Sequence, residues 1–219
     1  MIVGIDQYVV HVVDDDAEQR ERLLSDLARA GFRTRTYGSG EDFLDTTDPE
    51  AGCVVLDMHL PGINGREVRR AITERGLAIK VIVATAFADV PLARAAFRDG
   101  VIDVLEKPLD SAALVSAVQR AFDTLLVEST RHERAEHAQE LLARLTPRQR
   151  EVLDLLVEGY ISKQIAFKIG CSVRTVEAHR GQVMKRLEVT SLAELTRLYL
   201  DAASTPEQHT DEESTVHAS

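Results

Sequence analysis

Short apolar runs alternate with longer amphipathic stretches over the first half of the chain. The stretch at residues 17–31 places leucines at helical spacing and ends at a glycine. Several runs are almost continuously apolar, which is typical of strands buried on both faces of a parallel sheet. The pattern predicts an α/β domain over residues 1–126, with a doubly wound, five-stranded, flavodoxin-like parallel sheet. The five runs lie at residues 8–13, 32–37, 53–58, 80–85 and 101–105.

The second half of the chain carries only helical periodicity. From Ser111 a pattern without Gly or Pro continues to Leu145, which predicts one long helix whose second part, residues 127–145, links two domains. That part is mostly polar with a thin apolar line, so it bridges the domains, pairs with a second copy, or is a plain solvated linker. Four short helical segments then predict an all-α, four-helix domain over residues 146–203. Residues 204–219 are polar and acidic and are expected to be disordered.

Composition narrows the class of protein without identifying it. The chain has 219 residues, of which 44% are hydrophobic and 28% charged, as in ordinary globular proteins. It has no apolar segment near the roughly 20 residues that cross a membrane, and its first residues lack a basic region and a cleavage site. These features predict a cytoplasmic protein with no membrane partner. The two cysteines, Cys53 and Cys171, stand far apart and are expected to be reduced thiols.

The net charge of −10 is unevenly distributed along the chain. An acidic first half and a slightly basic second half predict two domains with different partners. The small positive charge of the second half gives only weak support for DNA binding. The charge is −7 over residues 1–127, −1 over 128–145, +2 over 146–203 and −4 over 204–219.

Polar side chains follow four of the predicted strands. Asp14 and Asp15 come after the first strand, Asp57 ends the third, Thr85 ends the fourth, and Lys107 follows the fifth. A strand-end aspartate taken alone is usually a helix cap, but these four positions share one edge of a parallel sheet.

The chemistry of this edge points to a phosphoryl group and a metal ion. Crowded carboxylates repel one another, and Mg²⁺, which prefers oxygen ligands and phosphate, would relieve the repulsion at Asp14, Asp15 and Asp57. A carboxylate can also act as a nucleophile toward phosphorus. Lys107 would neutralise the charge of the transferred group, and the Thr85 hydroxyl would donate a hydrogen bond to it.

Residues 8–126 resemble the receiver domain of two-component response regulators. The resemblance is carried by the segments VVDDD, VVLDMHLPGINGREV, VIVATA and DVLEKP. It implies that Asp57 is phosphorylated, that Asp14, Asp15, Asp57 and the backbone carbonyl of His59 hold Mg²⁺, and that Thr85 and Lys107 contact the phosphoryl group. It also implies a cis bond between Lys107 and Pro108. Receivers of this kind usually carry Phe or Tyr three residues before the lysine, where this chain has Val104. The switch is then expected to act through backbone shifts of residues 86–108 or to be weaker.

The segments SKQIAFKIG and SVRTVEAHRGQVMKRL predict a helix-turn-helix, because their apolar residues fall at helical spacing. Polar side chains on the outer face of the second helix could enter a major groove, although a solvated face of a structural bundle has the same composition. Residues 146–200 resemble the LuxR-type helix-turn-helix, and the whole chain is similar to the NarL/FixJ family of response regulators. The resemblance implies base contacts by Arg174, Glu177, Ala178 and Gly181, and phosphate contacts by Lys163, Gln164, Thr175, Arg180 and Lys185.

These resemblances imply a DNA-binding transcriptional response regulator that is not an enzyme. A sensor histidine kinase would phosphorylate Asp57, and the phosphorylated chain would form a homodimer through its last helix and bind a double-stranded operator with two half-sites. RNA polymerase is a further partner that such a regulator would contact. Two alternatives stay open. The receiver could serve dimerisation without phosphate, or Asp14 could be the nucleophile of a haloacid-dehalogenase-like phosphohydrolase.

Overall fold

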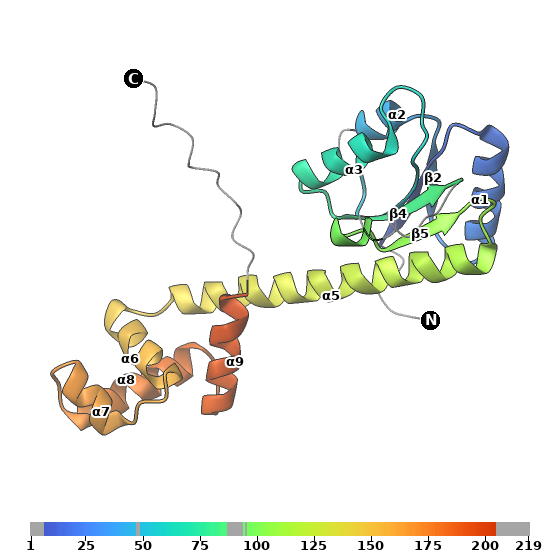
Figure 1. Ribbon diagram of the computed structural model, residues 1–219. Coiled ribbons are helices and arrows are strands. Elements are labelled where there is room, and N and C mark those ends of the chain that lie inside the picture. The colour runs from blue at the N-terminus through green and yellow to red at the C-terminus, as the bar shows by residue number, and fades with distance from the viewer. Residues whose placement is uncertain (1–6, 47–48, 87–93, 95, 205–219) are drawn as a thin grey trace, which may run out of the picture. The chain divides into compact units, whose positions relative to one another are not determined.

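The computed structural model describes residues 7–46, 49–86, 94 and 96–204, which form two compact units that divide between Glu128 and Ser129. The first unit is built on a parallel sheet with strand order β2-β1-β3-β4-β5 (Figure 1). This order confirms the predicted doubly wound sheet. The strands are β1 (Val9–Val13), β2 (Thr34–Tyr37), β3 (Gly52–Asp57), β4 (Ile79–Thr85) and β5 (Asp103–Glu106).

Two apolar cores cover the two faces of this sheet. Because successive side chains of a strand point to opposite faces, Val10 and Val12 of β1 enter one core, whereas Val13 enters the other. The first core includes residues of α1 and α5, and the second includes residues of α2 and α3, so helices cover both faces (Figure 1). The helices are α1 (Ala17–Arg29), α2 (Gly40–Leu44), α3 (Gly65–Glu74) and α5 (Ser111–Ala143).

A buried histidine in β1 is a feature that the sequence analysis did not identify. His11 is 1% exposed, and its ring lies 3.1 Å from the Tyr37 hydroxyl through Nδ1 and 2.9 Å from the Glu50 carbonyl oxygen through Nε2. Burial lowers the pKa of His11 below its ordinary value, although the hydrogen bond to Glu50 acts in the opposite direction. The side chain therefore favours its neutral form and belongs to the core rather than to the polar edge of the sheet.

The second unit is helical, as predicted, and packs around one apolar core. Leu153, Ile165 and Val176 are fully buried there, together with Leu142 near the end of α5. Thr146 caps the first of its short helices, because its hydroxyl accepts a hydrogen bond from the Gln149 N–H. The short helices are α6 (Pro147–Val157), α7 (Ser162–Lys168), α8 (Val173–Arg186) and α9 (Leu192–Ala202).

The predicted long helix is α5, which contributes residues to both units. Its thin apolar line is covered in the single chain, since Ala135 and Ala138 are buried and Gln139 Nε2 donates to the Ala202 carbonyl of α9 at 3.1 Å. The finer division into a linker at 127–145 and a separate tail stays a prediction. Most of that tail, residues 205–219, lies outside the described residues. No described helix is long and apolar enough for a membrane span.

Candidate functional site

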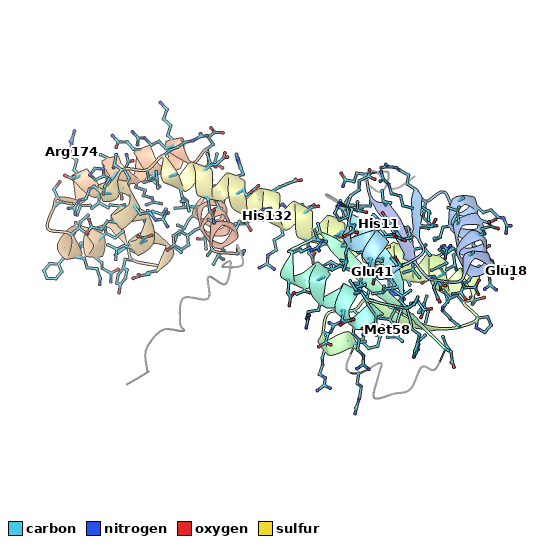
Figure 2. The ribbon with its side chains drawn as sticks, turned by 90° about the horizontal axis from the view of Figure 1, so that it is seen from above. His11, Glu18, Glu41, Met58, His132 and Arg174 are labelled. Atoms are coloured by element: carbon cyan, nitrogen blue, oxygen red, sulfur yellow. The ribbon has the colours of Figure 1, made fainter. Side chains whose placement is uncertain are left out.

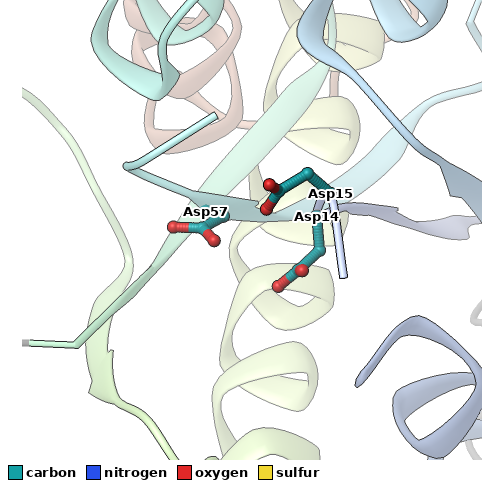
Figure 3. A group of neighbouring side chains, drawn as sticks. All are labelled: Asp14, Asp15 and Asp57. Atoms are coloured by element: carbon teal, nitrogen blue, oxygen red, sulfur yellow. The ribbon is translucent and has the colours of Figure 1, made fainter. Parts of the chain in front are cut away.

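Three carboxylates meet at the carboxyl edge of the sheet. Asp14 directly follows β1 and Asp57 ends β3, and the pairing of Val13 with Leu56 places these two strand ends side by side. Asp14 and Asp57 are 2% and 6% exposed, whereas Asp15 is exposed. One carboxylate oxygen from each of Asp14, Asp15 and Asp57 lies within 4.8 Å of the other two (Figure 3). These three residues were predicted from the sequence to share this edge, and the structure brings them together.

Lys107 lies between two of the carboxylates. Its Nζ is 2.8 Å from Asp14 Oδ2 and 2.5 Å from Asp57 Oδ2. Lys107 is the first residue after β5. Burial by itself disfavours the charged ammonium, but hydrogen bonds and the negative charges of Asp14 and Asp57 outweigh that cost and raise the pKa of Lys107 above its ordinary value. The ammonium is therefore charged and partly neutralises the two buried acids.

Thr85 and His59 lie at the same edge of the sheet as the three carboxylates. Thr85 is the buried last residue of β4, one position beyond Ala84, which pairs with Asp57. Its carbonyl oxygen accepts the Lys107 N–H at 2.8 Å. The His59 N–H donates to Asp57 Oδ1 at 2.9 Å, which fixes the loop after β3 against the carboxylate. The bond between Lys107 and Pro108 is cis, as the resemblance implied.

Two residues at the start of α1 contact this site, and neither was predicted from the sequence. Gln19 Nε2 donates to Asp14 Oδ2 at 2.5 Å, and Arg20 Nη1 donates to the Asp14 carbonyl oxygen at 2.6 Å. Asp16 caps α1 by accepting the Glu18 and Gln19 N–H groups. This cap directs the first turn of α1 toward the end of β1, so a search of the four positions after Asp16 could have found Gln19 and Arg20.

Gly65, the first residue of α3, packs directly against the phosphoacceptor candidate. A Cβ at this position would lie 2.4 Å from the Asp57 carbonyl oxygen and 2.9 Å from the Met58 Cα, both backbone atoms that cannot move aside easily. Asn64 caps the same helix, because its side chain accepts from the Arg66 and Glu67 N–H groups. The glycine thus lets α3 begin in contact with the backbone of Asp57.

Val104 lies in β5, opposite Val83 of β4, and packs half-buried against the second core of the sheet. The aromatic side chain that receivers usually carry at this position is therefore replaced by a small core residue. Of the segment 86–108 that was expected to transmit the signal, residues 87–93 and 95 lie outside the described part of the chain.

In the second unit, α8 is held by α6 and α7. The buried Gln149 of α6 donates to Gln182 Oε1 at 2.9 Å, and Arg186 Nη1 donates to Gln149 Oε1 at 3.0 Å. Ser172 caps α8, because its hydroxyl accepts the Thr175 N–H at 3.1 Å. These contacts fix the helix while its other face stays open to a ligand.

The nine residues predicted to contact DNA lie on α7 and α8. Eight are exposed and Arg180 is half-buried, and Figure 2 shows Arg174 on the surface of the helical unit. Gln164 has a structural task as well, since its Oε1 accepts the Ile161 N–H at 3.0 Å where α7 begins. The nine are Lys163, Gln164, Arg174, Thr175, Glu177, Ala178, Arg180, Gly181 and Lys185.

Comparison with known families matches both units. Residues 10–119 match the response regulator receiver domain, and residues 143–199 match the luxR family of bacterial regulatory proteins. The chain is 39% identical over 198 residues to the transcriptional regulatory protein FixJ of Azorhizobium caulinodans, covering 90% of this chain and 94% of that protein. The chain belongs to the NarL/FixJ family of response regulators. It is a transcriptional regulator with a receiver domain and a DNA-binding domain.

Solved structures of response regulators resemble most of the chain. The low-resolution structure of the response regulator StyR has a TM-score of 0.75 and 35% identity, covering 89% of this chain and 98% of that one. Full-length FixJ from B. japonicum has a TM-score of 0.56 and 32% identity, covering 90% and 98%. Because such relatives are transcriptional regulators and not enzymes, the phosphohydrolase alternative is set aside.

Proposed function

We propose that this response regulator binds its operator under the control of phosphorylation at Asp57 by a sensor histidine kinase. The observation that carries the proposal is the position of Lys107 Nζ between the Asp14 and Asp57 carboxylates, with Asp15 and Thr85 at the same edge of the sheet. A carboxylate beside a charged ammonium can accept a phosphoryl group, since the ammonium offsets the charge that accumulates on the phosphoryl oxygens.

The acidic cluster fits a magnesium ion. All three side chains offer carboxylate oxygens, which are the ligands that Mg²⁺ prefers, and these oxygens lie within 4.8 Å of one another. Asp14, Asp15, Asp57 and the backbone carbonyl of His59 would hold the ion. When bound, it supplies positive charge against the phosphoryl oxygens. Lys107 would stay on the phosphoryl group as a point charge, and the Thr85 hydroxyl would donate to one of its oxygens.

Phosphorylation would stabilise a conformation of the receiver that pairs, and pairing would present two helix-turn-helix domains to an operator with dyad symmetry. The exposed Leu192 and Leu200 of α9 support a homodimer contact in the DNA-binding unit, because they lie two helical turns apart on one face of α9. RNA polymerase remains a proposed partner. A regulator of transcription has to reach the chromosome, so a cytoplasmic location is part of the proposal.

The chemical test is to trap the acyl phosphate and locate it. The protein is incubated with a small-molecule phosphodonor and Mg²⁺, the acyl phosphate is reduced with borohydride, and the modified peptide is identified by mass spectrometry. We expect the modification at Asp57. Modification at Asp14, the nucleophile of the phosphohydrolase alternative, or no modification at any aspartate of the cluster would contradict the proposal.

A receiver that serves dimerisation without phosphate is the second candidate. The observation that favours it is Val104, which leaves β5 without the aromatic side chain that usually accompanies the switch threonine. The two candidates differ in whether operator binding depends on Asp57.

Replacing Gly181 by alanine tests the predicted DNA interface, because the substitution should raise the stability of the helical unit and lower its affinity for the operator. A Cβ at Gly181 would lie in open space within the protein, so Gly181→Ala should stabilise α8 by about 0.5–1 kcal/mol. In the major groove the added methyl group would displace the helix from the base edges and weaken operator binding by about 1–3 kcal/mol, the size of one base contact. Urea denaturation and gel-shift titration measure the two effects, and undiminished binding would remove Gly181 from the interface.

A further inference from the structure

The hydroxyl of Ser162 is hydrogen-bonded to a side chain of α8, the second helix of the predicted helix-turn-helix. Ser162 is the first residue of α7, and its Oγ is hydrogen-bonded to Glu177 Oε1 in α8, fifteen residues away in the sequence. The same Oε1 lies 3.9 Å from Arg180 Nη1, one turn further along α8. Two groups therefore converge on one oxygen of this carboxylate.

This serine does not have the usual task of a serine at the start of a helix. The hydroxyls of Ser39, Ser172 and Ser191 each accept a backbone N–H and cap α2, α8 and α9. At α7 the cap residue is Ile161, and the side chain of Gln164 binds its N–H instead. The Ser162 hydroxyl is thus available to position a side chain of the neighbouring helix.

Holding Glu177 in one position matters because of where this side chain lies. It is 52% exposed on the face of α8 that carries Arg174 and Arg180, and a long exposed side chain samples many rotamers unless a partner holds it. With Oε1 bound to Ser162, the carboxylate would be restrained, and its second oxygen, Oε2, would meet a ligand from a defined direction. A carboxylate only accepts hydrogen bonds, so in a major groove it favours the amino groups of cytosine or adenine and is repelled by the carbonyl oxygens of guanine and thymine.

We propose that Ser162 is a specificity-determining residue that positions Glu177, so that Oε2 accepts a hydrogen bond from the amino group of one base in each half-site. The inference rests on the proposed DNA-binding function and deepens it, because it assigns base discrimination to a pair of side chains from two helices. Ser162 acts through Glu177 and needs no DNA contact of its own.

The test selects operators from a randomised half-site library with the full-length protein, phosphodonor and Mg²⁺. Glu177→Ala first identifies the base pair whose preference depends on the carboxylate. At that base pair we expect Ser162→Ala to reduce the wild-type preference for an amino-bearing base roughly tenfold, the scale of one base contact. Ser162→Thr, which keeps a hydroxyl, should retain most of it. In the Glu177→Ala background, Ser162→Ala should change nothing further, because the residue that it positions is absent.

Two controls separate positioning from folding. Ser162→Ala should lower the thermal midpoint of the protein less than Ser191→Ala, since the Ser162 hydroxyl caps no helix and its hydrogen bond joins exposed side chains, whereas Ser191→Ala should lower the midpoint without changing the base preference. Unchanged preference in Ser162→Ala together with lost preference in Glu177→Ala would overturn the inference and leave the proposed function intact. Preferences that are the same in Glu177→Ala and the wild type would also overturn it. Failure of the wild-type protein to select any sequence would instead count against the proposed function.

Discussion

Replacement of Asp57 by asparagine is expected to abolish the gain in operator affinity that a phosphodonor produces. Asparagine has nearly the same shape, but its amide is not a nucleophile toward phosphorus, so no acyl phosphate forms. A gain of about 5- to 150-fold in the wild-type protein would be of the usual size for coupling between two sites. Gel-shift titrations with and without phosphodonor and Mg²⁺ measure the gain in both proteins.

Asp123→Asn is the matched control, because Asp123 is an exposed aspartate of α5 outside the acidic cluster. It should keep the full response to the phosphodonor. If Asp57→Asn responds as strongly as the wild type, the proposal of control at Asp57 is wrong. If neither the wild type nor Asp57→Asn responds to the phosphodonor, and the two proteins bind the operator equally, the receiver serves dimerisation without phosphate.

The second large effect concerns the stability of the receiver. Phe122 of α5 is 1% exposed, and its ring centroid lies 5.4 Å from that of Tyr8 and 5.6 Å from that of Phe32. Phe122→Ala removes this buried ring and leaves a cavity, so we expect the free energy of unfolding of the receiver to fall by about 3–5 kcal/mol. Guanidinium denaturation followed by tyrosine fluorescence and circular dichroism measures the change.

Phe167→Ala provides the comparison, since Phe167 of α7 is 91% exposed. Its effect on stability should stay within about 0.5 kcal/mol. The helical core around Leu153 contains no residue near Phe122 in sequence, so the unfolding of the helical unit should be unchanged in Phe122→Ala. An equal loss of stability in both units would contradict the division of the chain into two cores.

The fold could be predicted because its signals are local. Continuous apolar runs, such as residues 53–56 of β3, are typical of strands buried on both faces of a sheet, and parallel strands bring Asp14, Asp57 and Lys107 to one edge. The strand limits were less well predicted. The second strand was expected from residue 32 but begins at Thr34.

Contacts between side chains of different elements could not be predicted from the pattern. The burial of His11 depends on Tyr37 and Phe43, which the fold brings to its ring from β2 and α2. Gln19 reaches Asp14 only because Asp16 caps α1 and sets the direction of its first turn. The bond between Ser162 and Glu177 likewise depends on how α7 packs against α8, which hydrophobic spacing does not specify.

The contact of Gly65 with the backbone of Asp57 restricts how this receiver can evolve. Any residue with a side chain at position 65 would press on backbone atoms of Asp57 and Met58, and the Asp57 carboxylate would lose its alignment with the Lys107 ammonium. The first residue of α3 therefore has to remain glycine for the helix to begin at this place. Arg70 and Glu74 are exposed later in the same helix and pair with each other, so substitutions there would not press on the backbone of Asp57.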